Sequence, residues 1–356
     1  MNILFRKVRT MPHQNPHPED KPAWSRALLV ALAAALAITL ALLAFAWPSF
    51  TSTPKNLRVS VVASEPAYDA LAQSMRQQDA PFDLARADSR EEAEGLIARR
   101  EAYGAFLIPQ DPAAPVEVLT APAANNSVAT MMDTAGTALH KQRIGAALAS
   151  GSVTEPQALS RLLQQSLEGP TVTEVAPLPE DDPQGSGLAV AALPLTLGGI
   201  IGGVLISLKV RGRGPRLAAI LAYSALAASA LLPILHAWFG FLPTASAPLW
   251  GALALGIGAT AALVTGLHGL LGFPGIGLGA VITMFLGNPL SGATLPLEFL
   301  PWHFDAIGRC LVPGATQELL RTLSYFPEAG TAHAWWTLTA WTALGLLCLA
   351  VGRRQR

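Results

Sequence analysis

The chain is poor in the residues that most soluble enzymes use for structure and chemistry. Only 13% of its 356 residues are charged, and its two cysteines are Cys310 and Cys348. Two cysteines without a CxxC sequence or a zinc-like Cys/His spacing predict neither a disulfide framework nor a zinc site. The chain also lacks a Gly-x-x-x-x-Gly-Lys-Ser/Thr sequence, so it does not bind ATP through a P-loop. We therefore expect no catalytic residues, metal or cofactor, and the formal net charge of 0 gives no indication of nucleic acid.

Charge is absent above all from three long stretches. Asp, Glu, Lys and Arg do not occur in Gly187–Leu208, Leu217–Leu286 or Thr331–Val351. Proton-coupled carriers and pumps use an ionisable group inside the membrane, so the sequence disfavours self-energised proton transport. The remaining titratable side chains lie near the ends of these stretches and are interpreted as interfacial: His236, His268 and His333.

Long hydrophobic runs dominate what is present. The chain is 51% hydrophobic, with a mean hydropathy of +0.39, as expected for a membrane protein with a sizeable soluble part. A helix of about 20 apolar residues crosses the roughly 30 Å hydrocarbon core. The predicted spans are residues 27–47, 187–208, 217–239, 249–271, 276–286 and 331–351. The first is interpreted as a retained anchor, because the apolar core of a signal peptide, the alternative, has only about 7–15 residues.

Residues 48–186 carry most of the charge and predict a soluble domain between the first two spans. We expect strands at residues 57–63, 104–109 and 116–120, and helices at 67–77, 89–99, 126–148 and 155–167. Ser89 and Glu92 fit a capping box at the start of the second helix. The single histidine of the domain, His140, is interpreted as a surface or capping residue. The predicted fold class is a polytopic α-helical membrane protein of six spans with an α/β (or α+β) domain.

Positive charges predict the orientation. Lysines and arginines gather in residues 1–26, in the loop 209–216 and in the tail 353–356. Six spans place all three on the cytoplasmic side, in agreement with the positive-inside rule. Residues 48–186 are then extracytoplasmic, and residues 187–352 form the membrane domain. The basic loop is expected to contact lipid headgroups or a separate ATPase through Lys209, Arg211, Arg213 and Arg216.

Two further patterns lie in the membrane domain. Glycines recur four residues apart at Gly198/Gly202 and Gly199/Gly203, and are interpreted as helix-packing notches rather than substrate contacts. Residues 288–326 are divided by prolines, so we expect broken, re-entrant helices on the outer face. The residues that indicate this segment are Pro289, Ser291, Gly292, Pro301 and Pro313. Ser291 with His268 could also suggest an intramembrane protease, but Asn-Pro-Leu precedes Ser291 instead of the Gly-x-Ser-Gly that such a site needs.

The order of elements and several short sequences indicate a family. The sequences are Leu57–Ala63, Ser89–Ala93, Tyr103–Pro109, Leu193–Leu195, Gly198–Gly203, Asn288–Ala293, Pro296, Leu300–Pro301 and Pro313–Gly314. Over nearly the whole chain this arrangement resembles the type-2 ABC exporter permeases, and within them the YhgE/Pip-like branch with a large extracytoplasmic domain. The resemblance implies a homodimeric permease of the bacterial inner membrane. Such permeases move lipids, drugs or glycan precursors outward, together with a separate ATPase subunit.

The loop 209–216 departs from this family, whose cytoplasmic coupling segment is helical and of mixed charge. Here the loop is purely basic and is interrupted by Gly212, Gly214 and Pro215. A stand-alone permease therefore stays open beside an ATPase-coupled one. A second class of function also stays open, namely a non-transporting receptor or scaffold whose extracytoplasmic domain binds a partner.

Overall fold

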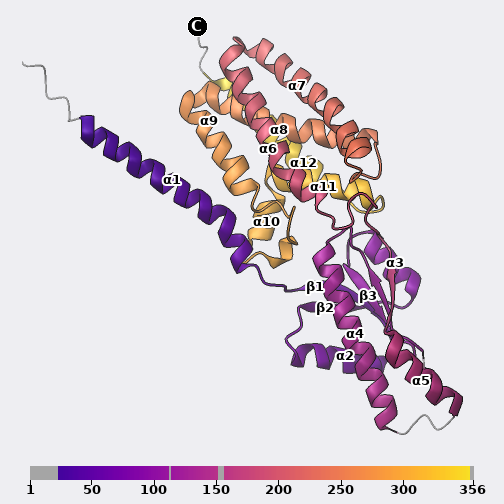
Figure 1. Ribbon diagram of the computed structural model, residues 1–356. Coiled ribbons are helices and arrows are strands. Elements are labelled where there is room, and N and C mark those ends of the chain that lie inside the picture. Colours follow the sequence, from indigo (N-terminus) through magenta and orange to yellow (C-terminus); the bar gives the residue numbers. More distant parts are fainter. Residues whose placement is uncertain (1–22, 112–113, 151–155, 353–356) are drawn as a thin grey trace, which may run out of the picture.

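A computed structural model describes residues 23–111, 114–150 and 156–352 of the chain. It contains an α/β domain, a helical bundle above it, and a first helix that slopes away from the bundle (Figure 1). The basic residues expected in the N-terminal tail lie mostly outside the described residues, as do those of the C-terminal tail. The orientation predicted from these two tails therefore stays a prediction.

The α/β domain is built on a mixed five-stranded sheet. Its strands are β1 (Leu57–Val62), β2 (Phe82–Arg86), β3 (Gly104–Leu107), β4 (Glu117–Thr120) and β5 (Thr171–Glu174). The order across the sheet is β2-β1-β3-β4-β5, with β3 and β4 antiparallel and the other neighbours parallel. The sequence predicts β1, β3 and β4 but misses β2 and β5. These two are the edge strands, whose partly exposed residues lack a clear hydrophobic pattern.

Four helices accompany the sheet, and their bounds lie close to those expected from the sequence. They are α2 (Glu65–Gln77), α3 (Arg90–Ala98), α4 (Asn126–Ala149) and α5 (Pro156–Glu168). The capping box of α3 is confirmed in modified form. Ser89 Oγ accepts from the Glu92 backbone N–H at 3.1 Å, but the Glu92 carboxylate accepts from Asp88 N–H at 2.6 Å rather than from Ser89.

His140 is buried, so the surface half of the sequence-based interpretation was wrong, whereas its contact with a carbonyl oxygen in the last turn of α5 agrees with the capping half. Its side chain is only 2% exposed, and Nε2 lies 3.1 Å from the backbone oxygen of Gln165. The contact joins α4 to α5, which covers this part of α4. A buried histidine of this kind is stabilised by one hydrogen bond to a partner 25 residues away. The covering helix is a tertiary feature that the local sequence around His140 does not reveal.

Five described helices are long and apolar enough to cross a membrane. They are α1 (Ala23–Thr51), α6 (Gly187–Lys209), α7 (Arg213–Pro233) with its π-helical continuation Ile234–Trp238, α8 (Ala247–Leu271) and α12 (Ala332–Val351). The sixth expected span falls in α9 (Phe273–Ala280) and the π-helical Val281–Gly287. This shorter apolar helix reaches only about 22 Å at 1.5 Å per residue, less than the hydrocarbon core. Five of the six expected spans therefore have full length.

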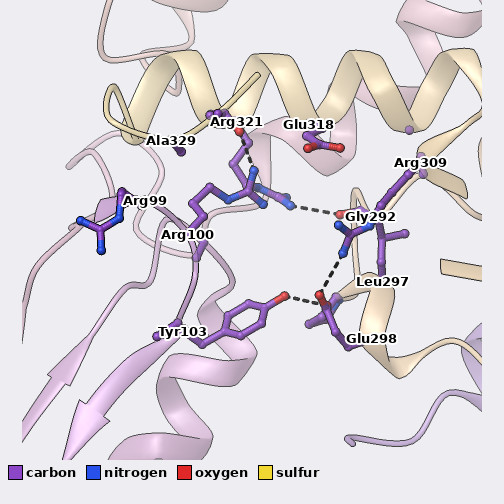
Figure 2. A pocket seen from close by; sticks show the side chains of 17 residues that line it. Arg99, Arg100, Tyr103, Gly292, Leu297, Glu298, Arg309, Glu318, Arg321 and Ala329 are labelled. Atoms are coloured by element: carbon purple, nitrogen blue, oxygen red, sulfur yellow. Dashed lines mark hydrogen bonds and ion pairs between the residues drawn. The ribbon is translucent and has the colours of Figure 1, made fainter. Parts of the chain in front are cut away.

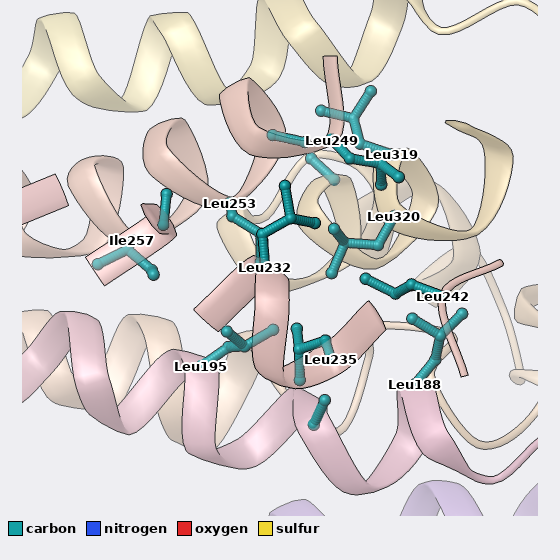
Figure 3. Close-up of a cluster of buried hydrophobic side chains, with 14 of the residues drawn as sticks. Leu188, Leu195, Leu232, Leu235, Leu242, Leu249, Leu253, Ile257, Leu319 and Leu320 are labelled. Carbon is teal, nitrogen blue, oxygen red and sulfur yellow. The ribbon is translucent and has the colours of Figure 1, made fainter. Parts of the chain in front are cut away.

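Helix α8 is the centre of the bundle. In its most apolar stretch 67% of the residues are buried, against 22% in α7 and α12. Leucines and an isoleucine of α6, α7, α8 and the later helix α11 (Val312–Tyr325) meet in one core (Figure 3). By contrast, none of the most apolar stretch of α1 is buried. Helix α1 touches the rest only near its end, where Phe45 meets Phe285 and Trp47 meets Phe304 edge-on.

The predicted glycine pairs face two neighbouring helices. A Cβ on Gly199 would come within 2.6 Å of Thr260, and one on Gly203 within 2.9 Å of the Ala261 carbonyl oxygen, both in α8. Gly202 lies against the ring of Tyr223 in α7, whose hydroxyl donates to the Gly198 carbonyl at 2.6 Å. All four glycines thus lie where α6 meets its neighbours, the position expected of packing notches.

We expect Gly203→Ala to destabilise the purified protein by about 1–3 kcal/mol, because the new methyl group meets α8 backbone that cannot move aside. Gly198→Ala is the matched control, since its methyl group would lie 3.7 Å from the nearest heavy atom, Tyr223 Oη. Thermal unfolding in detergent would compare the two. Equal melting temperatures for both variants would contradict the packing role of Gly203.

Candidate functional site

The segment between α9 and α12 is folded against both the bundle and the α/β domain. It contains a 3-10 turn at Leu297–Phe299, the short helix α10 (Phe304–Arg309) and α11. Pro313 lies in the first turn of α11, where a proline costs no hydrogen bond, and packs against the backbone at Gly287. On the next turns Leu319 and Leu320 are fully buried. The segment is therefore an integral layer of the structure and not a loose connection.

Two aromatic side chains of this segment complete the core of the α/β domain. Phe299 is 5% exposed and belongs to the cluster of Leu57, Val59 and Phe106 on one face of the sheet. Phe326 is 1% exposed and joins the cluster on the opposite face. Burial of a phenylalanine side chain contributes about 1.5–3 kcal/mol. The two aromatics fix the domain to the bundle from both faces of one sheet.

Polar contacts also connect the α/β domain to the segment between α9 and α12, and we call this contact region the junction. Tyr103 donates its hydroxyl to Glu298 Oε2 at 2.7 Å, and Arg309 approaches Glu298 Oε1 at 3.2 Å (Figure 2). Arg100 donates through Nη1 to the Thr322 hydroxyl at 2.5 Å. Burial, together with the charge of Glu298, raises the pKa of Tyr103, which keeps its hydroxyl protonated as the donor. The contacts join the α3–β3 connection to α11 and to the 3-10 turn.

Arg100 is held in an unusual backbone conformation. Its φ is +59°, in the left-handed region that costs a side-chain-bearing residue about 1–2 kcal/mol. The backbone N–H of Arg100 donates to the Ile97 carbonyl at 2.9 Å, which ends α3. The guanidinium group also lies over the Phe326 ring, 5.6 Å from its centroid. The turn thus directs this side chain at α11.

Arg321 fixes the turn that precedes the 3-10 element. It donates to the carbonyl oxygens of Gly292 at 3.1 Å and Ala293 at 3.3 Å. Gly292 has a φ of +69°, a conformation that glycine adopts without strain. Burial, followed by the charge of Arg100, lowers the pKa of Arg321 to about 10. Arg321 therefore stays charged at neutral pH, although its site disfavours that charge.

A cavity of about 190 Å³ lies among these residues. Four arginines and two glutamates line it, in a setting that also includes Ser291, Gly292 and Gly314: Arg99, Arg100, Arg309, Arg321, Glu298 and Glu318 (Figure 2). Positive side chains thus outnumber negative ones around a polar space at the junction. Among the described residues, no group of three or more His, Cys, Asp or Glu side chains is arranged to hold a metal ion.

The residues predicted for this outer segment lie in three different environments. Ser291 and Gly292 line the cavity, Pro313 begins α11, and Pro289 and Pro301 lie in the irregular connections. The protease alternative finds no support, because Ser291 Oγ donates to the Asn288 carbonyl at 2.7 Å, whereas the His268 ring packs edge-on against Phe273. Sequence reasoning missed Arg100, Tyr103 and Arg321 as a group. Their charges and aromatic character are visible, but not the fold that brings them together.

The basic loop contains two kinds of residue. Lys209 and Arg211 are exposed, as expected of headgroup or ATPase contacts. Arg216, in contrast, is 7% exposed and donates to the carbonyls of Val210 and Ser207 at 2.9 Å, so the expected contact is wrong for this residue. Arg213 is exposed, as expected, and also donates to the Gly352 carbonyl at 2.6 Å. Both arginines satisfy carbonyl groups at helix C-termini, which carry partial negative charge.

We expect Tyr103→Phe to loosen the junction, because it removes a hydrogen bond to a charged acceptor worth about 1.5–3 kcal/mol. Hydrogen exchange of the full chain should become faster in the 3-10 turn and in the first residues of the strand β3. Tyr68→Phe is the matched control, since the Tyr68 hydroxyl bonds to Leu84 within the domain at 3.0 Å. The same exchange pattern in both variants would contradict a specific role of Tyr103 at the junction.

A comparison of the chain with protein-family models, curated proteins and solved structures found no match. The resemblance of the element order to YhgE/Pip-like exporters is neither supported nor contradicted by this result and stays an expectation. What the chain does is therefore inferred from its own residues and their geometry.

Proposed function

We propose that this chain is the permease subunit of an exporter resembling type-2 ABC transporters, in a bacterial inner membrane. The observation that carries the proposal is the shared core at the junction, where Phe299 and Phe326 of the membrane domain are buried in the α/β domain. Phe326 and the bond of Arg100 to Thr322 join the domain to α11, which packs on α8. Phe299 and the bond of Tyr103 to Glu298 join it to the 3-10 turn. A movement of the bundle is thereby transmitted to the domain, and the reverse.

The proposed orientation places the α/β domain outside the cell. Helix α6 begins beside the junction, where the Asp182 carboxylate accepts from the backbone N–H groups of Ser186 and Gly187 at 2.9 and 2.8 Å. It is 23 residues long and ends at the exposed Lys209. The basic loop then faces the cytoplasm, in agreement with the positive-inside rule. Both termini are cytoplasmic in this arrangement if α9 and its π-helical continuation form one span. The bilayer would be locally thinner around this short span.

The route proposed for a substrate lies on the outside of the bundle. The cavity between α6, α8 and α11 is about 10 Å³, which is at the lower limit for one water molecule. Helices α7 and α12 leave most of their apolar surface exposed. These surfaces suit lipid tails or a second copy of the chain. A lipid, a drug or a glycan-type substrate would therefore move along an interface of a homodimer.

The experiment that tests the proposal is purification of the tagged chain from its native membrane in mild detergent. We expect a dimer with a separate nucleotide-binding subunit and ATPase activity. Lys209→Glu with Arg211→Glu should release that subunit, because both side chains are exposed and lie in the loop proposed to be cytoplasmic. Lys55→Glu with Arg58→Glu, which changes charge by the same amount on the α/β domain, should leave the complex intact.

A second function, a membrane receptor or scaffold that does not transport, is favoured by the closed interior of the bundle. In that case the α/β domain binds a partner and the helices serve as its anchor. A purified chain that carries no nucleotide-binding subunit and no ATPase activity would contradict the ATPase-coupled exporter. Transport of lipid by that isolated chain in vesicles would then indicate a stand-alone permease, and its absence the receptor.

A further inference from the structure

We propose that the arginine-lined cavity at the junction binds the oxyanion of a phosphate group. The cavity is enclosed by the α3–β3 connection on one side and by α11 and the turn at Gly292 on the other. The proposal goes beyond the proposed function, since a site of this kind can serve an exporter or a receptor.

The first argument is the balance of charge. Arg99 is paired with Glu101 at 2.9 Å, and Arg309 with Glu298 at 3.2 Å. Among the described residues, Arg100 and Arg321 have no carboxylate within 4.0 Å, and their own bonds go to a hydroxyl group and two carbonyl oxygens. Two guanidinium groups at one cavity therefore lack a negative partner. Charged groups that are partly removed from water are normally paired, so this pair indicates an anion.

The second argument is the mutual effect of these two arginines. The charge of Arg100 contributes to the lowered pKa of Arg321, after burial. An anion between them would replace this repulsion by two attractions. Arg100 also retains a left-handed backbone conformation, whose cost is consistent with a functional constraint on the direction of its side chain.

The third argument is the fit of size and chemistry. About 10–15 Å³ of a cavity measured in this way holds one water molecule, so the cavity of about 190 Å³ accommodates a phosphate group with part of its ester substituent. Arginine is suited to this ligand, because its planar group presents paired N–H donors to two oxygen atoms of a phosphate. Arg100 and Arg321 are half-buried, and both line the cavity.

The two glutamates do not cancel this preference. Glu298 already accepts from Tyr103 and is paired with Arg309. Glu318 lines the cavity from α11 and has no ion pair among the described residues. Its charge opposes an anion, which gives the cavity one side chain whose removal should strengthen binding. Stronger binding after removal of the Glu318 charge would distinguish an anion-binding site from a general loss of stability.

The experiment measures binding to the full chain in detergent by calorimetry. The probes are inorganic phosphate and dihexanoyl phosphatidylglycerol, and dihexanoylglycerol serves as the lipid without a phosphate group. We expect Arg100→Gln to weaken binding of a phosphate-bearing probe by roughly tenfold or more, since it removes a charge-assisted hydrogen-bond donor. Glu318→Gln should strengthen binding several-fold, and Arg58→Gln, an exposed position of β1, should leave it unchanged.

Binding of phosphatidylglycerol with little affinity for inorganic phosphate would assign the site to a lipid headgroup, and the reverse would assign it to a soluble phosphate. Either result supports the proposal. It is overturned if neither phosphate-bearing probe binds, if dihexanoylglycerol binds equally well, or if Arg58→Gln and Arg100→Gln act alike. Should Arg100→Gln fail to fold, Arg100→Lys and Glu318→Gln retain the test, because they predict weaker and stronger binding respectively. If the purified chain binds a phosphate-bearing probe but has no ATPase partner, the anion site is supported and the ATPase-coupled exporter is contradicted.

Discussion

The bundle depends on close approach of its helices to α8, and glycine makes that approach possible. Gly199 and Gly203 lie against α8 from α6, and Gly256 of α8 lies against Thr316 of α11. Gly266 of α8 and Gly345 of α12 meet backbone to backbone, too close for any side chain between them. Because lipid tails offer no hydrophobic driving force between helices, van der Waals contacts at such close approaches contribute to the association of the helices. The position of α11, and with it the junction, follows from this packing.

The junction connects the packed bundle to the α/β domain. Phe299 and Phe326 enter the two faces of its sheet, so the domain does not have a complete core without the membrane domain. Arg100, Tyr103 and Arg321 are therefore held in place by two units at once. A cavity lined by charged groups can persist there because the surrounding aromatic contacts are stable. Because Arg321 lies on α11 and Arg100 on the α/β domain, the proposed anion site spans the junction between the two units.

The regular elements could be predicted where the pattern is local. The long apolar runs predict α6, α8 and α12 within a few residues, and Ser89 with Glu92 predicts the start of α3. The local pattern does not predict the edge strands β2 and β5 or the burial of His140, because these features depend on neighbours that are distant in the chain. Of the candidate site, the sequence indicated Ser291 and Gly292 in a broken segment, but not the arginines that meet there.

Hydropathy and charge by themselves determined that this chain has apolar helices of membrane-spanning length and one charged domain between the first two, since both properties are sums over neighbouring residues. The tertiary structure alone decided that Arg216 is buried while Lys209, Arg211 and Arg213 are exposed, and that Arg213 and Arg216 donate to carbonyl groups at helix C-termini. It also decided that Arg100 and Arg321, 221 residues apart in the sequence, share one cavity. Contacts between residues so far apart in the sequence depend on how whole elements pack, and a local sequence pattern does not predict them.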